Sequence, residues 1–140
     1  MDVLLHIADW SLFLFHTVLV VFNCIGWAWK RTRRWHLATM GVTLTSWLLL
    51  GIWFGTGYCI CTDLHWRVRE SLGQKVTEDT YIQYLVAKLT GWTPDAHLAT
   101  QAAGVVFVVS AILTIALNLR DWRTNAKGRA ARELPVELSR

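Results

Sequence analysis

The chain has 140 residues, of which 54% are hydrophobic and 17% are charged, and its formal net charge is +4. Soluble domains carry about 25% charged residues, so the composition excludes an ordinary basic soluble domain. Nine tryptophans are a heavy load for this length. The charges lie in blocks between long apolar runs, and the sequence therefore predicts an all-α membrane protein.

Three apolar runs predict transmembrane helices, at residues 3–29, 37–61 and 98–119. Crossing about 30 Å of hydrocarbon takes about 20 helical residues, and each run is long enough. The first run lacks a basic start and a small-residue cleavage site, so we expect it to be retained rather than removed as a signal peptide. An additional amphipathic helical segment, outside the membrane, is expected over residues 62–97.

Basic residues favour one orientation of these spans. The turn KRTRRWH between the first two runs holds four Lys and Arg and no acid, and the tail over residues 123–140 is also basic. Basic segments of this kind stay in the cytoplasm. We therefore expect a membrane domain at residues 1–122 in a bacterial inner membrane, with the N-terminus outside and the tail cytoplasmic. Beside membrane spans these cations favour anionic lipid over nucleic acid.

The outer segment is predicted to contain two short helices. Asp63 is expected to cap the first, which ends at Gly73. Thr77 is expected to cap the second, which ends at Gly91. The apolar residues of the second helix recur with the helical period, at Ile82, Leu85, Val86 and Leu89. We expect this helix to lie along the outer interface or to pack on the bundle.

Polar side chains form one stripe on each predicted span. In the first span Asp9, His16 and Asn23 repeat every seven residues, which keeps them on one face with about 20° of drift per repeat. The other stripes are Thr39, Thr43 and Ser46 in the second span, and Ser110, Thr114 and Asn118 in the third. Because polar groups are costly in hydrocarbon, we expect a hydrogen-bonded seam inside a three-helix bundle. The alternative is a proton path or small-ligand pocket around His16.

Small residues four apart predict close helix packing. Gly51 and Gly55 have this spacing in the second span, as do Ala99 and Ala103 in the third. The spacing suits packing within the chain or between the copies of a homo-oligomer.

Histidines and cysteines near the outer face are candidate metal or haem ligands. They are His6, Cys59, Cys61, His65 and His97, with Asp63 beside them. Imidazole and thiolate suit zinc or copper, and the sequence leaves open an outer haem. However, C-x-C is not the C-x-x-C spacing of metal or redox motifs, and the histidines are scattered. The structural interpretation is therefore favoured, and no cofactor is predicted.

Within one chain, a haem held by two histidines at His16 is disfavoured, because His36 lies at the inner end of the second span and His97 just before the outer end of the third. The sequence also lacks G-x-S-x-G, H-E-x-x-H and a P-loop. It therefore predicts no enzyme.

Two stretches, HTVLVVFNCIGWAWKRTRRWH and SWLLLGIWFGTGYCICTDLHWRVRESLG, carry a resemblance to a family of small bacterial membrane proteins, domain-of-unknown-function family 2784. The resemblance covers roughly residues 10–118. The matching positions are His16, Asn23, Gly26, Trp27, Trp35, His36, Trp47, Gly51, Tyr58, Cys59, Thr62, Asp63, His65, Trp66 and Gly73. Ile60 stands where the family pattern GYCPLTD has proline. The resemblance implies the membrane architecture and marks His16, His36 and residues 59–65 as positions to test.

These features lead us to expect a non-catalytic accessory or structural subunit of a membrane complex. Its expected partners are the lipid bilayer and other membrane subunits or further copies of itself. The alternative is a haem- or metal-binding redox protein that uses the outer His and Cys residues. A third hypothesis is a small transporter or proton-conducting element along His16.

Overall fold

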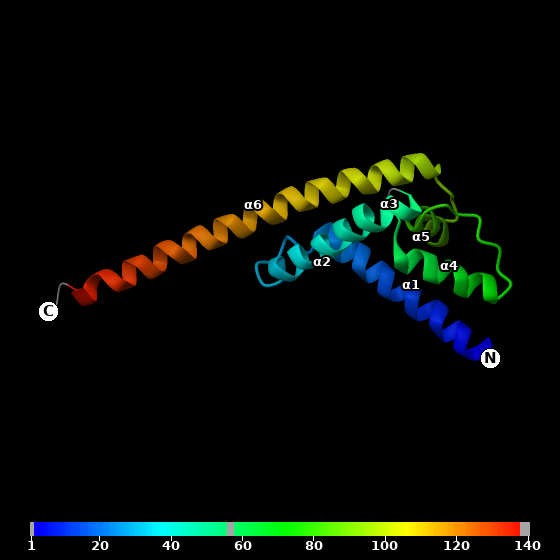
Figure 1. The fold of residues 1–140 in the computed structure, drawn as a ribbon, viewed down its shortest axis with the longest axis horizontal. Helices are drawn as coiled ribbons and strands as arrows, with labels where there is room; N and C mark the ends of the chain where they lie inside the picture. The colour runs from blue at the N-terminus through cyan, green and yellow to red at the C-terminus, as the bar shows by residue number, and fades with distance from the viewer. Residues whose placement is uncertain (1, 56–57, 138–140) are drawn as a thin grey trace.

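The computed structural model describes residues 2–55 and 58–137, with side chains through Arg129. In these residues the fold is all-helical, as predicted (Figure 1). The elements in chain order are α1 (Asp2–Ile25), α2 (Arg33–Thr45), the π-helical turn η1 (Ser46–Leu50), α3 (Gly51–Phe54), α4 (Ile60–Ser71), α5 (Tyr81–Thr90) and α6 (Ala96–Glu137).

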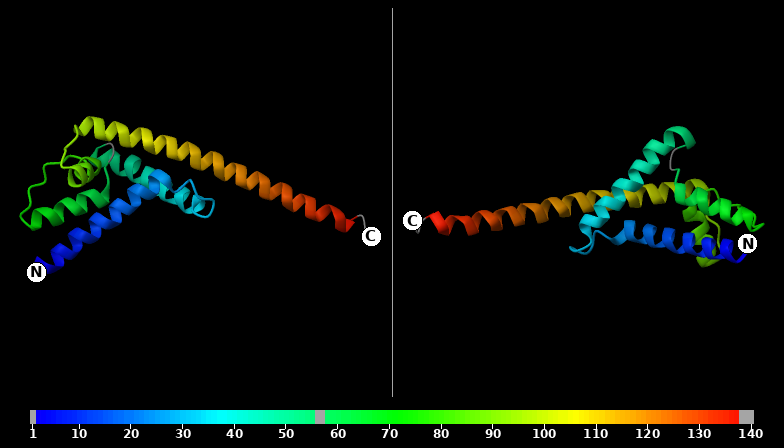
Figure 2. Two further views of the ribbon diagram at one scale, coloured as in Figure 1. Left: turned by 180° about the vertical axis from the view of Figure 1, so that it is seen from behind. Right: turned by 60° about the horizontal axis from the view of Figure 1, so that its bottom comes forward.

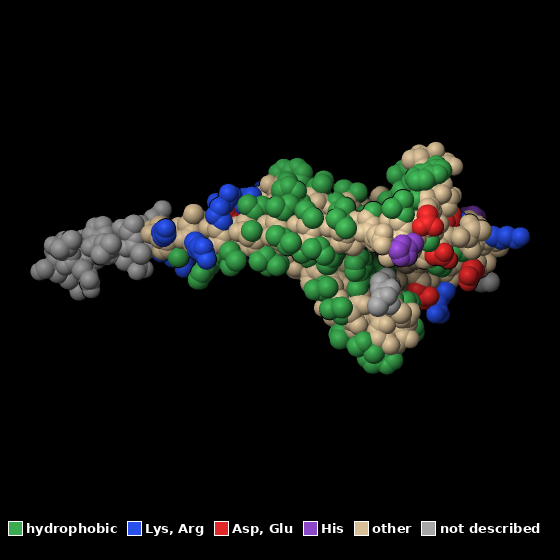
Figure 3. Space-filling view, turned by 90° about the horizontal axis from the view of Figure 1, so that it is seen from above, with side chains coloured by type: hydrophobic (Ala, Val, Ile, Leu, Met, Phe, Trp, Pro, Cys, Tyr) green, Lys and Arg blue, Asp and Glu red, His purple; other side chains and the backbone are tan. Residues whose placement is uncertain are grey.

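Within the described residues, three helical stretches are long and apolar enough to cross a membrane: Asp2–Ile25, Arg33–Phe54 and Ala96–Arg129. The predicted architecture of three spans with a helical segment between the second and third is thus confirmed. Figure 3 shows many apolar side chains on the face of the spanning helices that it draws. A surface of this kind suits contact with lipid, where backbone groups must be satisfied within each helix.

The second span ends earlier than the predicted 37–61. Its helix passes through η1 and stops at Phe54, because Gly55 takes a φ of +99°, which a side chain would disfavour. Cys59 is extended, and α4 begins directly after it. Residues 56–57 of the predicted span lie outside the described residues. Gly55 is exposed, with no atom within 4 Å of an added Cβ, so it ends a helix instead of packing against one.

The other predicted packing residues differ in burial. Ala99 is buried at the start of α6, while Ala103 and Gly51 are half-buried. Of the predicted packing residues, Ala99 of α6 is therefore the one buried against the rest of the chain, whereas Gly55 of the second span is not.

The two short helices form, but their starts differ from the prediction. Asp63 lies in the first turn of α4 instead of capping it, because the helix begins at Ile60. The N-cap of α5 is Thr80 rather than Thr77, and the Thr80 hydroxyl accepts a hydrogen bond from the Gln83 amide at 3.2 Å. Gly91 ends α5 with a φ of +73°.

The helices pack in two groups. α4 lies against α1, while α2 and the first part of α6 flank α1 further along, and α5 contacts α6. Figures 1 and 2 show α6 continuing well beyond the other elements. The predicted tail is thus helical through Glu137, and residues 138–140 lie outside the described residues.

The interior is polar and aromatic rather than aliphatic. Among the side chains that the structure describes, the buried apolar residues are Met40, Tyr81, Tyr84 and Ala99. The buried polar residues of the same set are Asp9, His16, Arg33, His36, His65, Gln83, Ser110 and Thr114. In water the aliphatic side chains would fill the core. Here they face outward, and hydrogen-bonding side chains join the helices.

Candidate functional site

The polar stripe of α1 faces the other helices along its length. Asp9 and His16 are buried and Asn23 is half-buried. The seven-residue spacing keeps the three on one face, but each finds a partner in a different part of the chain. The stripe therefore builds two separate clusters, one at Asp9 and His16 and one at Asn23.

The first cluster begins with Asp9 and His65. His65 Nε2 lies 2.8 Å from Asp9 Oδ1, and the His65 side chain is fully buried. Burial lowers the pKa of His65, and the hydrogen bond to Asp9 opposes this shift only in part. The imidazole is thus favoured in its neutral form, with Nε2–H donating to the carboxylate. His65 Nδ1 is buried without a hydrogen-bond partner.

His16 continues this cluster toward the middle of α1. Its ring stacks on Tyr81 with centroids 3.7 Å apart, and its Nε2 lies 3.8 Å from Cys59 Sγ. The Tyr81 hydroxyl donates to the Phe13 carbonyl at 2.9 Å and also contacts the Thr17 hydroxyl at 2.9 Å. Tyr81 thus fastens α5 to α1.

The second cluster joins all three spans at Asn23 and His36. The Asn23 amide donates to Thr43 and accepts from Thr39, at 3.0 Å and 2.9 Å. His36 is fully buried, and its Nε2 lies 3.0 Å from the Asn23 carbonyl. A carbonyl only accepts, so Nε2 carries the proton and Nδ1 accepts from the Thr114 hydroxyl. Both nitrogens of His36 are therefore occupied.

An ion pair lies beside the second cluster. Arg33 Nη1 is 2.7 Å from Asp121 Oδ2, and Arg33 Nε donates to the Trp27 carbonyl at 3.0 Å. The pair ties the turn after α1 to α6. Sequence reasoning counted Arg33 only among the basic turn residues; the signal for its role was Asp121, an acid within a basic stretch.

The predicted metal candidates do not converge. His6 and His97 are exposed, Asp63 pairs with Arg67 on the same helix, and His65 is bonded to Asp9. In the described part of the chain no group of three His, Cys, Asp or Glu side chains is placed to hold a metal ion. Burial and the neighbouring Cys59 raise the pKa of the Cys61 thiol. The cysteines at 24, 59 and 61 are free thiols.

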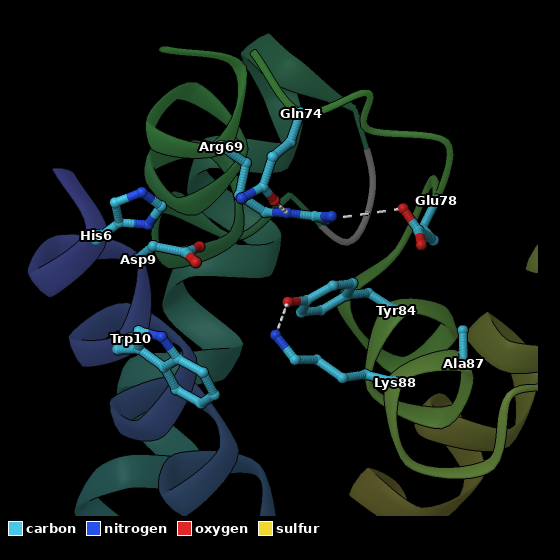
Figure 4. A pocket seen from close by; sticks show the side chains of 9 residues that line it. All are labelled: His6, Asp9, Trp10, Arg69, Gln74, Glu78, Tyr84, Ala87 and Lys88. Carbon is cyan, nitrogen blue, oxygen red and sulfur yellow. Dashed lines mark hydrogen bonds and ion pairs between the residues drawn. The ribbon is translucent and has the colours of Figure 1, made fainter. Parts of the chain in front are cut away.

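A cavity of about 460 Å³ opens beside the first cluster, between α1, α4 and α5 (Figure 4). Its lining residues are His6, Asp9, Trp10, Arg69, Gln74, Glu78, Tyr84, Ala87 and Lys88. Of these, the sequence pointed to His6 and Asp9. The others come from several elements, and no periodicity encodes how these elements fold back onto α1: Trp10 of α1, Arg69 of α4, Gln74 and Glu78 between α4 and α5, and Tyr84, Ala87 and Lys88 of α5.

Fold and site together define a multi-pass helical membrane protein whose helices are joined by buried polar side chains. The family model described as "Protein of Unknown function (DUF2784)" matches residues 6–119. The chain belongs to this family, as the sequence resemblance predicted. Comparison with curated proteins and with solved structures gave no match.

Proposed function

We propose that the protein is a non-catalytic accessory subunit of a larger membrane complex. The observation that carries the proposal is the C-terminal part of α6. Side chains from Trp122 to Arg129 are all exposed, and Figure 2 shows this arm leading away from the bundle. A polar helix without tertiary contacts is marginal by itself in water, so an arm of this kind suits a partner that binds it.

The buried titratable groups support the same role. His36 has both ring nitrogens bonded, Asp9 and His65 bond each other, and each of these contacts joins two helices. Groups held in this way specify how the helices fit together. The arrangement favours a scaffold over an enzyme.

The charge distribution supports a cytoplasmic C-terminus. The Arg33–Asp121 contact brings the basic turn after α1 to the same end of the bundle as Arg120 and Arg123 of α6. Most acidic side chains visible in Figure 3 lie at the opposite end. By the positive-inside rule this favours an inner-membrane protein with its N-terminus outside.

The orientation is tested by cysteine labelling in intact cells. In a chain whose Cys24, Cys59 and Cys61 are replaced by serine, a membrane-impermeant maleimide should label Lys75→Cys, between α4 and α5. It should label Thr124→Cys only after the cells are opened. Both positions are exposed, so each serves as the accessibility control for the other. The reverse labelling pattern would overturn the proposed orientation.

The accessory role is tested by native gel electrophoresis and mass spectrometry of mildly solubilised membranes. The full chain should run with a second polypeptide in fixed stoichiometry, and a chain lacking residues 123–140 should lose it while still inserting. Arg31→Gln/Arg34→Gln, which removes exposed charge from the turn at the same end, is the control and should keep the partner. A full chain that runs alone or only with copies of itself would contradict the proposal.

A haem- or metal-binding redox protein is the second candidate, and the contact between His16 and Cys59 is the observation that favours it. The absorbance spectrum and metal content of the same preparation distinguish the two. A Soret band or a stoichiometric metal that His16→Leu abolishes would replace the accessory role with this one.

A further inference from the structure

The cavity between α1, α4 and α5 has chemistry that the polar clusters do not use. At about 460 Å³ it falls within the size range of small-molecule pockets, about 300–1,000 Å³. Figure 4 shows Asp9 and Trp10 on one side, Tyr84 and Lys88 on the other, and Arg69 with Gln74 between them at one end. Three separate elements therefore bring charged groups to one space.

Arg69 has an unused donor at this cavity. Its side chain is only 12% exposed, and its guanidinium lies over Tyr84 with Cζ 4.4 Å from the ring centroid. Nε donates to Gln74 at 3.0 Å, whereas Nη1 is buried without a hydrogen-bond partner. Glu78 is 3.8 Å away, beyond hydrogen-bonding distance. An unsatisfied buried N–H of a cation is costly, and a bound acceptor would satisfy it.

Lys88 supplies the second cation, on the same tyrosine. Its Nζ donates to the Tyr84 hydroxyl at 2.9 Å and lies 4.9 Å from the Trp10 ring centroid. Among the described residues no carboxylate lies within ion-pair distance of it. The ammonium has three donors, and only one of them is accounted for here.

The acids of the cavity set a second requirement on the ligand. Asp9 and Glu78 bring two negative charges to balance Arg69 and Lys88, so the lining is close to neutral when His6 is uncharged. A ligand with only negative charge would be opposed by these carboxylates. A ligand with one anionic and one cationic group satisfies both kinds of side chain.

The depth of the cavity indicates where such a ligand comes from. His6 and Trp10 lie in the first half of the α1 span, and Trp10 and Trp92 are both about 61% exposed. Exposed tryptophans of this kind mark the level of the lipid head groups at the membrane surface. The cavity therefore opens where zwitterionic lipid head groups are abundant.

We propose that this cavity binds the head group of a phospholipid carrying both a phosphate and a primary ammonium, as in phosphatidylethanolamine. The phosphate accepts hydrogen bonds from Arg69 and Lys88, and the ammonium donates to Glu78 and Asp9. This proposal is independent of the accessory role, since it concerns a different end of the molecule.

The test is native mass spectrometry of the full chain, delipidated in detergent and titrated with defined lipids. Phosphatidylethanolamine should bind at one saturable site, about tenfold tighter than phosphatidylglycerol, which lacks the ammonium. Phosphatidylcholine should also bind weakly, because its quaternary ammonium has no N–H to donate. Equal binding of the three lipids, or no saturable site, would overturn the proposal.

Variants assign the site. Lys88→Gln should weaken phosphatidylethanolamine binding about tenfold, the usual effect of losing one charge-assisted hydrogen bond. Lys75→Gln, at an exposed lysine before α5, is the matched control and should bind normally. The same comparison is made on α4, where Arg69→Gln should weaken binding and the exposed Arg67→Gln is its control. If Arg69→Gln does not fold, Lys88→Gln alone decides the test. Unchanged binding by Lys88→Gln would refute the site.

A last titration separates the lipid from a soluble source of the same group. Free phosphoethanolamine should bind at least tenfold more weakly than the lipid, because it lacks acyl chains to lie against the apolar spans. If it binds as tightly as the lipid, the cavity takes a soluble ligand and the lipid assignment is wrong.

Discussion

Gly26 lies where α1 turns toward α2, and the close packing there makes a sharp prediction. A Cβ added at Gly26 would lie 2.6 Å from His36 Cδ2 and 2.7 Å from the Phe22 carbonyl. His36 is fully buried and is held by the Asn23 carbonyl and the Thr114 hydroxyl. Gly26→Ala must therefore push the imidazole out of its hydrogen bonds or shift the turn.

The expected cost follows from these contacts. Overpacking a filled interior costs about 1–3 kcal/mol. Losing one of the two hydrogen bonds of His36 adds about 1 kcal/mol, since each contributes about that much net. We expect Gly26→Ala to lower the free energy of unfolding by about 2–4 kcal/mol.

The assay is reversible unfolding in mixed micelles, with a denaturing detergent as the variable and helical circular dichroism as the signal. Gly41→Ala in α2 is the control, because no atom lies within 4 Å of its Cβ position, and alanine there should be neutral or favour the helix by up to about 1 kcal/mol. In the background of His36→Ala, Gly26→Ala should cost less, because the clash with the ring is gone while the close contact with the Phe22 carbonyl remains. A Gly26→Ala protein as stable as Gly41→Ala would refute the packing argument.

Three further predictions concern other contacts. The free energy of unfolding should fall as the pH drops through about 6.5, because burial holds the pKa of His65 in the folded protein below that value, and the unfolded chain takes up the proton first. His65→Gln should flatten this pH dependence in thermal melts. A pH profile that His65→Gln leaves unaltered would contradict the role of His65. Thr80→Ala should lower the free energy of unfolding by about 1 kcal/mol because it removes the N-cap of α5, whereas Thr77→Ala should change it by less than about 0.5 kcal/mol. Equal effects of the two substitutions would contradict the assignment of Thr80 as the N-cap. Arg33→Gln should lower the melting temperature more than Asp121→Asn, because Arg33 also donates to the Trp27 carbonyl. Arg34→Gln, at an exposed arginine, is the control. An Arg33→Gln protein with the same melting temperature as the Arg34→Gln protein would contradict the role of the ion pair.

The number of spans and the polar face of α1 could be predicted because each depends on one local property. Apolar length identifies a membrane helix, and a seven-residue repeat fixes a face. Neither property says what the face meets. Asp9, His16 and Asn23 share a face as predicted, yet their partners lie in α4, α5 and α2.

The residues that sequence reasoning missed are mostly those that act across long separations. Tyr81 bonds Thr17 from 64 residues away, and Arg33 bonds Asp121 from 88 residues away. A tyrosine at the start of a short helix gives no local sign that its hydroxyl will bond the backbone of another helix. The helix ends were missed for a different reason, because Gly55 stops the second span through its φ angle although the apolar run continues past it.

The separation of the two polar clusters has a consequence for how the protein responds to ligands and partners. The Asn23–His36 cluster joins α1, α2 and α6 with every nitrogen of His36 bonded, so it fixes the spans that carry the C-terminal arm. The Asp9–His65 cluster joins α1 to α4, leaves His65 Nδ1 unbonded, and shares Asp9 with the cavity. A head group that engages Asp9 therefore acts on the packing of α4 against α1, whereas a partner on the arm acts on α6. The clusters share the helix α1, and α5, which lines the cavity, also contacts α6, so any coupling between lipid binding and partner binding should pass through α1 or α5.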